Sequence, residues 1–301
     1  MDELLVETLG TSTRAWQYGD ADGAPLVLVH GFRGDHHGLA GIARAAAERL
    51  PGVRAIVPDL PGFGATPPVP GREHDLDLYG EWLRALVAGL GAGPGASGHA
   101  ILGHSFGSLV VANAVAGGLA PSRAILVNPI SSPALEGPQA VLTRLAIGYY
   151  RAADVLPERP ARALLGHPAI VRTMSEVMAK TGDRELRRWI HGQHRDHFSD
   201  FSDTSTLLGA FRASVSHTVT EYAEAFDMPT LIIAGERDDI APLPAQLALH
   251  RRVPGSRFRV LPGVGHLVHY ETVGDAADEI AAFLRAAVPA EKAPKERALT
   301  R

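Results

Sequence analysis

Ser105 has neighbours that could make it a nucleophile. Residues 103–107 read Gly-His-Ser-Phe-Gly, a G-x-S-x-G pentapeptide with this serine at its centre. The apolar run 100–102 precedes the pentapeptide, and residues 109–115 follow it with apolar side chains at helical spacing. In such a strand–turn–helix context, a sharp turn exposes the serine hydroxyl above a sheet. The two glycines are expected because backbone and helix approach too closely there for a Cβ atom.

A serine hydroxyl is a poor nucleophile unless a base takes its proton and a third group orients that base. After a serine elbow, the acid and then the histidine are expected later in the chain. Two adjacent aspartates, Asp238 and Asp239, come shortly after the apolar run 231–234. His266 stands in a loop directly after the run 260–261. Acid and base therefore appear in the expected order, each just past a predicted strand.

Acyl transfer also needs donors for the negative charge that develops on the carbonyl oxygen, and a backbone N–H there is worth ~3 kcal/mol. The N–H of Phe106 is one expected donor, because it follows the serine at a helix N-terminus. The second should come from the loop after an early strand. That loop reads His-Gly-Phe-Arg-Gly over residues 30–34. Gly31 allows its tight turn, and Phe32 is the expected donor.

Apolar runs bounded by turn residues predict strands that are buried on both faces, as in a parallel sheet covered by helices. These runs are 25–29, 54–57, 100–102, 124–127, 229–233 and 258–261. Between them lie amphipathic stripes of helical spacing, such as 82–90 and 273–284. Strands that alternate with helices predict an α/β fold with a doubly wound, mostly parallel sheet.

The alternation breaks between residues 131 and 222, where amphipathic patches such as 140–153 and 168–180 replace buried-strand runs. We interpret this segment as a helical lid over the carboxyl ends of the strands, where ligands bind in open α/β sheets. The last residues lack periodicity and are expected to form a flexible tail. The predicted division is core in 1–130, lid in 131–222, core in 223–288 and tail in 289–301.

Composition excludes several other classes of function. The chain has 301 residues, 46% of them hydrophobic and 21% charged, as in an ordinary globular protein. A net charge of −4 gives no reason to expect a nucleic-acid partner. The absence of cysteine excludes disulfides, thiolate nucleophiles and cysteine-ligated metals. The acidic N-terminus lacks a signal peptide and no stretch is long enough for a membrane span, so a cytoplasmic protein is expected. The sequence gives no oligomeric state.

The chain resembles the α/β-hydrolase superfamily, in its lidded branch of esterases and other small-molecule hydrolases. The resemblance covers roughly residues 24–130 and 228–286. The segments that carry it are His30-Gly31-Phe32, Asp59-Leu60-Pro61-Gly62-Phe63-Gly64, Gly103 to Gly107, Gly235-Glu236-Arg237-Asp238, and Gly265-His266 with Glu271.

Carried over to this sequence, the resemblance implies Ser105 as nucleophile and His266 as general base. It favours Asp238 over its neighbour as the acid, because the family spacing is a glycine, two further residues and then the aspartate, as in Gly235-Glu236-Arg237-Asp238. It also implies Phe32 and Phe106 as oxyanion donors. It implies no cofactor and no metal. The expected function is hydrolysis of a carboxylic ester or related small acyl compound through an acyl-enzyme.

Three other functions fit the same residues. The machinery could cleave a carbon–carbon bond of a dienoate or β-diketone, although such relatives usually carry tryptophan where Leu267 follows the histidine. It could transfer the acyl group to an acceptor other than water. A non-catalytic ligand-binding homologue would normally have lost a triad member. The resemblance excludes other relatives. Epoxide hydrolases and dehalogenases of this fold have aspartate where this chain has Ser105. Proline iminopeptidases have His-Gly-Gly-Pro-Gly in the oxyanion loop, which here reads His-Gly-Phe-Arg-Gly.

Several other polar and aromatic residues admit a structural interpretation beside a functional one. Arg33 could hold a substrate carboxylate, but we favour a solvated loop arginine. Phe63 could line an acyl pocket or pack in the core. Asn128 stands where some relatives place their acid, yet an amide cannot stabilise an imidazolium as a carboxylate does. We expect His104 to pack, and His269 with Glu271 to fix the last loop.

Two histidine-rich triplets could suggest a metal. Asp35, His36 and His37 are adjacent in sequence, and adjacent side chains rarely converge on one ion. No fourth ligand is apparent either. His191, His194 and His197 could share one helix face of the lid. We expect no metal at either triplet, and a hydrated polar surface at the second.

Overall fold

The computed structural model describes residues 1–91, 98–134 and 140–286, and no side chain of 140–143. The predicted tail, 289–301, therefore lies outside the described residues. Eight strands form one sheet in the order β1-β2-β4-β3-β5-β6-β7-β8. The strands are β1 (Asp2–Thr8), β2 (Thr11–Gly19), β3 (Ala24–Val29), β4 (Val53–Pro58), β5 (Ala100–His104), β6 (Arg123–Val127), β7 (Thr230–Gly235) and β8 (Arg257–Leu261).

The six predicted strands are β3 to β8, and all neighbours among them pair in parallel. The prediction of a mostly parallel α/β sheet is therefore confirmed. Their register aligns their carboxyl ends: Val29 pairs with Gly103, Val127 pairs with both His104 and Ile233, and Gly235 pairs with Leu261. Side chains that follow these strands consequently meet at one edge of the sheet.

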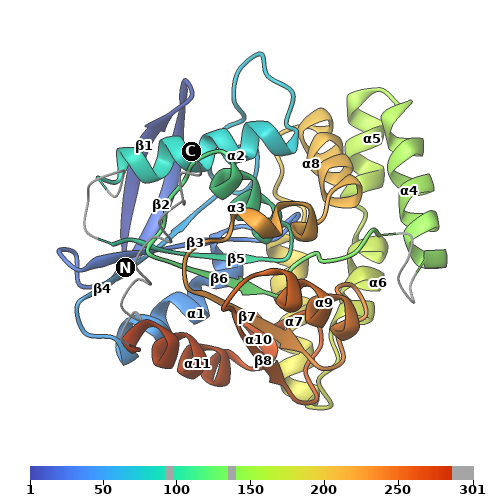
Figure 1. Ribbon diagram of the computed structural model, residues 1–301. Helices are drawn as coiled ribbons and strands as arrows, with labels where there is room; N and C mark the ends of the chain where they lie inside the picture. The colour runs from blue at the N-terminus through green and yellow to red at the C-terminus, as the bar shows by residue number, and fades with distance from the viewer. Residues whose placement is uncertain (92–97, 135–139, 287–301) are drawn as a thin grey trace, which may run out of the picture.

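Helices cover both faces of the sheet (Figure 1). On one face α1 (His36–Arg49) and α11 (Val273–Arg285) pack over apolar side chains such as Leu28 and Ile233. On the other face α2 (Leu76–Gly89), α3 (Phe106–Ala116) and α9 (Leu243–Arg252) enclose a second core that contains Trp82. These two cores explain the continuous apolar runs of β3 to β7, since each of these strands buries side chains on both sides.

The N-terminal hairpin of β1 and β2 was not among the predicted elements. The two strands are antiparallel, and β2 also pairs antiparallel with β4. Leu9 and Gly10 join them with φ of 47° and 79°, the positive values that two-residue hairpin turns of the favoured type require. β1 lies at the sheet edge and leaves many of its side chains exposed, so it lacks the continuous apolar run that revealed the other strands.

Between β6 and β7, the regular elements of the described residues are all helices, and we call residues 140–216 the insertion. Its helices lie together beside the sheet (Figure 1). They are α4 (Ala140–Asp154), α5 (Glu158–Leu165), α6 (Pro168–Met178), α7 (Arg184–His197) and α8 (Thr204–Ser216). A 3₁₀ helix, η1 (Val219–Ala225), then leads back to β7.

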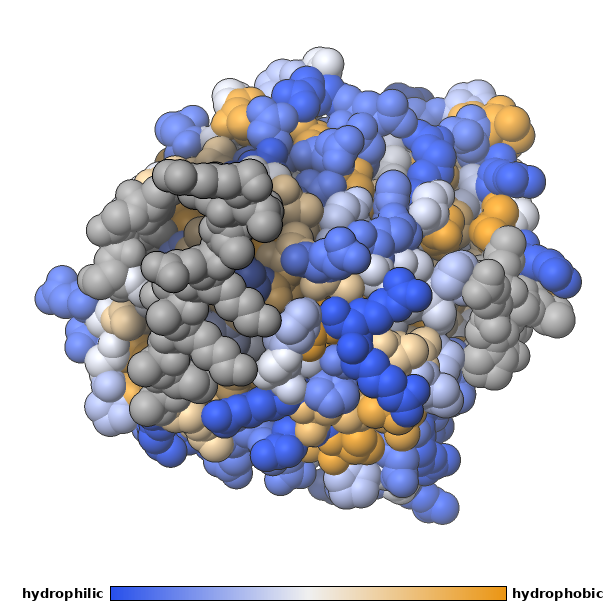
Figure 2. Space-filling view, in the orientation of Figure 1, coloured by the Kyte–Doolittle hydropathy of each residue, from blue (hydrophilic) through white to orange (hydrophobic). Residues whose placement is uncertain are grey.

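The surface carries no extended apolar face in the view of Figure 2, where hydrophobic residues form small groups among hydrophilic ones. The large hydrophobic side chains that stay exposed are few, and the insertion contributes Leu145, Val155, Leu156 and Trp189. Among the helices that the structure describes, none has both the length and the apolar character needed to cross a membrane.

Candidate active site

Ser105 sits on the sharp turn between β5 and α3. Its φ of 53° and ψ of −118° lie where non-glycine residues are rarely found, so neighbouring contacts must hold this conformation. A Cβ atom on Gly107 would lie 2.1 Å from the carbonyl oxygen of Val29, and one on Gly103 would lie 2.5 Å from that of Gly107. Both flanking positions therefore require glycine, as the pentapeptide predicted.

A chain of hydrogen bonds joins Ser105, His266 and Asp238. The Nε2 atom of His266 lies 2.8 Å from the Ser105 Oγ, and its Nδ1 atom lies 2.8 Å from Asp238 Oδ2. Since a carboxylate only accepts, Nδ1 carries the proton and Nε2 is free to accept the serine proton. All three side chains are buried, with Ser105 8% exposed. These hydrogen bonds therefore allow a proton to pass from the serine to the imidazole.

The second oxygen of Asp238 is fixed by the backbone. Oδ1 accepts hydrogen bonds from the N–H groups of Ile240 at 2.8 Å and Ala241 at 2.9 Å. Asp239 points elsewhere and pairs with Lys180 of the insertion at 2.6 Å. Of the two adjacent aspartates, the structure thus brings the first to His266.

The glycine-containing loop after β3 lies against the serine. A Cβ on Gly31 would meet Ser105 Cβ at 3.3 Å, so the loop passes as closely as a side chain allows. The N–H of Gly34 donates to the Gly31 carbonyl at 3.1 Å and closes a turn with Phe32 and Arg33 at its centre. The N–H of Phe106 opens helix α3 and has no acceptor within that helix. Both predicted oxyanion donors thus belong to segments that adjoin Ser105.

His30 anchors this loop from below. Its Nδ1 donates to the carbonyl of Gly31 at 2.9 Å, and its Nε2 accepts the N–H of Leu60 at 2.9 Å. Burial lowers the pKa of His30, so the ring stays neutral and can donate from Nδ1 while it accepts at Nε2. The loop after β3 is therefore tied to the segment that follows β4.

Asn128 follows β6 and joins the acid and base loops. Its Nδ2 donates to the carbonyls of Gly265 at 3.1 Å and His266 at 2.9 Å, while its Oδ1 accepts the N–H of Gly235 at 2.7 Å. The side chain is fully buried, and all its bonds go to backbone. A carboxylate here would face two carbonyl oxygens, so the amide suits a positioning role. From its position after a strand, Asn128 was predicted only as a possible displaced acid, because its bonds to the two distant loops leave no signal in the sequence.

Glu271 holds the base loop against the insertion, in agreement with its predicted role. One carboxylate oxygen accepts the N–H of Gly265 at 2.9 Å. The other accepts the N–H groups of Lys180 and Thr181, the latter at 2.9 Å. The loop that carries His266 is thereby connected to the segment between α6 and α7.

His104 lies directly behind the base. Its Nε2 donates to the carbonyl of His266 at 3.1 Å. Burial, together with the neighbouring His266, lowers the pKa of His104 to about 3. It is therefore neutral at physiological pH and adds no charge that would oppose an imidazolium at His266.

The expectation of a solvated Arg33 is wrong, because the side chain is only 1% exposed. Its guanidinium donates to the carbonyls of Phe198 at 3.0 Å and Leu165 at 2.8 Å, and to the Tyr150 hydroxyl at 3.1 Å. It also lies near Ser199 Oγ, at 3.4 Å. These partners all belong to the insertion, so Arg33 joins the oxyanion loop to that segment instead of offering a free guanidinium to substrate.

Phe63 is a core side chain at the junction of sheet and insertion. It is 1% exposed, and its ring lies edge-on to those of His30 and Phe32 with centroids 6.4 Å apart. Its backbone pairs with Phe201 in an isolated β-bridge. The structural interpretation therefore applies, and a role in an acyl pocket stays a prediction.

The predicted hydrated surface at His191 and His194 is also wrong. Both rings are buried, and each Nδ1 bonds to the hydroxyl of Ser175, at 2.5 Å and 2.7 Å. The shared serine links α6 to α7. Helical spacing placed the two histidines on one face correctly, but it could not show that α6 covers that face.

Residues 26–283 match the sequence profile described as "Alpha/beta hydrolase family". The chain belongs to the α/β-hydrolase family. It is 32% identical over 286 residues to the dihydrolipoyllysine-residue acetyltransferase component of the acetoin cleaving system of Pseudomonas putida, an alignment that covers 93% of this chain and 68% of that protein. It is 25% identical to Lipase 3 of a Moraxella species, over 87% of this chain and 77% of that one.

Among solved structures, this hydrolase is similar to a thermophilic esterase from Thermogutta terrifontis. The TM-score is 0.75 at 22% identity, with 95% of this chain and 98% of the esterase covered. At that identity the likeness establishes the fold. The relatives of this hydrolase by sequence include lipases and an acetyltransferase component. Family membership alone therefore does not determine its activity, which depends on its own residues.

Proposed function

We propose that this protein is a serine hydrolase that cleaves a carboxylic ester through a Ser-His-Asp triad. The observation that carries the proposal is the buried hydrogen-bonded chain from Ser105 Oγ through His266 to Asp238, with 2.8 Å at each step. Serine at the elbow argues against the epoxide-hydrolase chemistry of aspartate relatives.

The reaction follows from the direction of these hydrogen bonds. His266 Nε2 takes the proton of Ser105 as Oγ attacks the ester carbonyl carbon, and Asp238 stabilises the imidazolium. The N–H groups of Phe32 and Phe106 hold the oxyanion. The alkoxide leaves with the proton from His266, which forms the alcohol and the acyl-enzyme. Water then attacks that ester by the same route and releases the acid.

An apolar acyl group suits the aromatic side chains around Phe32. Its ring lies 6.4 Å from that of Phe106, 5.9 Å from Tyr150 and 6.0 Å from Phe211, centroid to centroid. Two of these partners, Tyr150 and Phe211, come from the insertion. We infer that the insertion acts as the predicted lid and supplies part of the acyl pocket.

Acyl transfer is a second candidate, and the 32% identity to an acetyltransferase component favours it. Transfer needs a site that keeps water from the acyl-enzyme, and Ser105 and His266 are only 8% and 5% exposed. In that version a thiol or hydroxyl acceptor takes the place of water in the second half of the reaction.

Turnover of p-nitrophenyl esters of increasing acyl length, with and without dihydrolipoamide, tests both versions. Hydrolysis predicts acid as the acyl product whether or not the dithiol is present. Transfer predicts a thioester that grows with dithiol concentration. Ser105→Ala is the control and should be inactive in both assays. Failure on every ester would favour the carbon–carbon bond hydrolase.

A further inference from the structure

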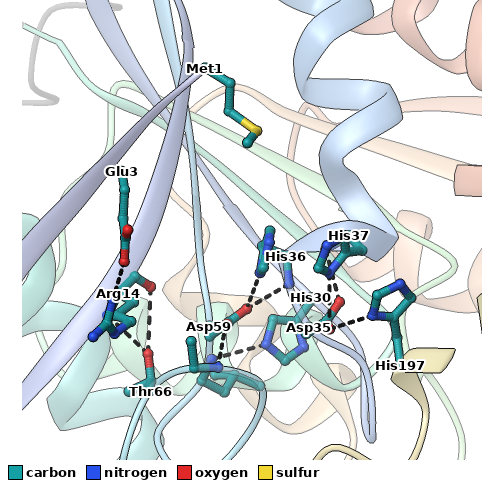
Figure 3. Close-up of polar contacts among 12 residues, drawn as sticks. Met1, Glu3, Arg14, His30, Asp35, His36, His37, Asp59, Thr66 and His197 are labelled. Carbon is teal, nitrogen blue, oxygen red and sulfur yellow. Dashed lines mark hydrogen bonds and ion pairs between the residues drawn. The ribbon is translucent and has the colours of Figure 1, made fainter.

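Asp35 brings two imidazoles together at the edge of the insertion (Figure 3). Its Oδ2 lies 3.1 Å from Nδ1 of His37 and 3.2 Å from Nδ1 of His197. Its Oδ1 accepts the backbone N–H of His37 at 2.9 Å and so caps helix α1. The carboxylate is buried, with 3% of the side chain exposed, and is fixed before any ligand arrives.

The two histidines come from parts of the chain that are far apart in sequence. His37 belongs to the first turn of α1, just after the oxyanion loop, and His197 is the last residue of α7 in the insertion. Their rings stack with centroids 3.9 Å apart and an angle of 22° between the planes, so a ring must turn about its χ2 bond before both nitrogen lone pairs can point at one ion. Each histidine stands in one of the two triplets in the sequence, and folding joins one triplet to the other.

The spacing of these donor atoms fits a small transition-metal ion. Zinc bonds to histidine nitrogen and carboxylate oxygen are about 2.0–2.2 Å long, so two ligands of a tetrahedral zinc lie roughly 3.3–3.5 Å apart. The two separations from the Asp35 oxygen, 3.1 Å and 3.2 Å, are within a few tenths of an ångström of that value, and all three donor atoms lie within 4.8 Å of one another. Two imidazoles and one carboxylate are donors that suit zinc, cobalt or nickel, whereas magnesium and calcium prefer oxygen alone.

We propose that Asp35, His37 and His197 bind a divalent transition-metal ion of the zinc type, which joins the insertion to the segment after the oxyanion loop. The imidazoles are accessible, with 44% and 27% of their side chains exposed, so an ion can enter and water can complete its coordination. The C-terminal end of α7 also favours positive charge at His197.

The neighbouring histidine and carboxylate do not compete for the ion. Asp59 accepts hydrogen bonds from the backbone and Nδ1 of His36, at 2.6 Å and 3.0 Å, and from the N–H of Ala65 at 2.8 Å. His36 stacks on Trp16 with centroids 3.3 Å apart. This pair is committed to the core, which leaves the other three residues as one site.

Calorimetric titration of Zn²⁺ into the tag-free, chelator-treated full chain tests the proposal, together with the visible absorption of added Co²⁺. We expect one ion per chain, a tetrahedral cobalt spectrum and a raised melting temperature. His37→Gln and His197→Gln should each weaken binding by more than the roughly 10–100-fold that loss of an outer-shell partner costs. Glutamine can still donate to Asp35, so both variants should fold, which circular dichroism checks.

His217→Gln is the matched control, because that histidine is likewise half-exposed and lies 3.2 Å from a carboxylate, that of Glu221, away from the cluster. Its zinc affinity should equal that of the wild type. The proposal is overturned if the wild type binds no zinc, because hydrogen bonds alone then hold the cluster. It is equally overturned if both cluster variants bind as tightly as the control.

Discussion

The conformation of Ser105 explains why its hydroxyl is directed at His266. A φ of 53° is costly for a serine, and the close approach of Gly107 to the carbonyl of Val29 holds the turn in place. The hydroxyl bonds to His266 Nε2 at 2.8 Å, while the backbone N–H of Ser105 donates to Val127 at 3.1 Å. The serine is thus positioned by packing before substrate binds, as a nucleophile that must attack in one direction requires.

Replacing Asp238 with asparagine should lower kcat by ~10⁴-fold, the scale of loss when this position of a triad is neutralised. The amide can donate to His266, which turns the imidazole into the wrong tautomer for accepting the serine proton. Steady-state kinetics on the best p-nitrophenyl ester measures the loss.

Asp239→Asn is the matched control, since it removes only the pair with Lys180, whose side chains stay partly exposed. Its kcat should stay within a few-fold of the wild type. A greater loss for Asp239→Asn than for Asp238→Asn would mean that the acid is assigned to the wrong aspartate.

At the scale of single residues, the functional residues that can be predicted from the sequence are the ones whose spacing follows a local motif. Ser105, Asp238 and His266 each follow a strand, and strand ends can be recognised in the sequence. Asn128 and Arg33 are different. Their partners lie 107–138 and 117–166 positions away, so only the folded chain shows what they contact.

At the scale of elements, Arg33 connects the oxyanion loop to the insertion. Two of its acceptors are the carbonyls of Leu165 and Phe198, at the C-terminal ends of α5 and α7, where helix dipoles favour positive charge. No carboxylate of the described residues pairs with it at ion-pair distance. The helix ends therefore act as the counter-ion of Arg33. Phe32, the predicted oxyanion donor, directly precedes Arg33 on the same turn.

Replacing Arg33 with methionine should destabilise the insertion more than the sheet. The side chain keeps its length, but each buried carbonyl left without a donor costs about 1–3 kcal/mol. We expect faster amide exchange and proteolysis near 150, 165 and 198, and a lower melting temperature. Hydrogen exchange with mass spectrometry measures the first effect.

Arg172→Met, within the insertion itself, provides the comparison, because that arginine is exposed and Glu176 is its one ion-pair partner among the described residues. Such surface pairs contribute about 0–1 kcal/mol. Equal exchange in both variants would contradict the role assigned to Arg33.

The pattern of buried apolar runs predicts β3 to β7 because those strands are covered on both faces. It also predicts β8, although that edge strand buries only Leu261. The same reasoning misses the β1–β2 hairpin, whose outer strand is largely exposed. It also misjudges His191 and His194, since helical spacing tells which residues share a face and not which helix covers it. Long-range packing decides both cases.

At the scale of the whole molecule, several histidines are buried in neutral form. Burial lowers the pKa of His104 to about 3 and that of His194 to about 4, from an ordinary 6.5, with a neighbouring histidine adding to each shift. Burial also lowers the pKa of His269 well below its usual range. These rings bind protons more readily in the unfolded chain than in the folded one.

The free energy of unfolding should therefore fall as the pH drops below about 6.5. Above that value the rings are neutral in both states, whereas below it only the unfolded chain gains protons until the folded pKa is reached. Urea unfolding at pH 5, 6, 7 and 8 measures the trend. His104→Gln should make it shallower. Stability that is constant or rises towards pH 5 would contradict this expectation.

If Ser105 is an activated nucleophile, a fluorophosphonate should label it covalently. The intact protein treated with a fluorophosphonate should gain the mass of a single adduct, which peptide mapping places on Ser105. Ser105→Ala should remain unlabelled, and His266→Gln should react far more slowly because the serine keeps its proton. A folded wild-type protein that gains no adduct, or gains it on another residue, would contradict the account.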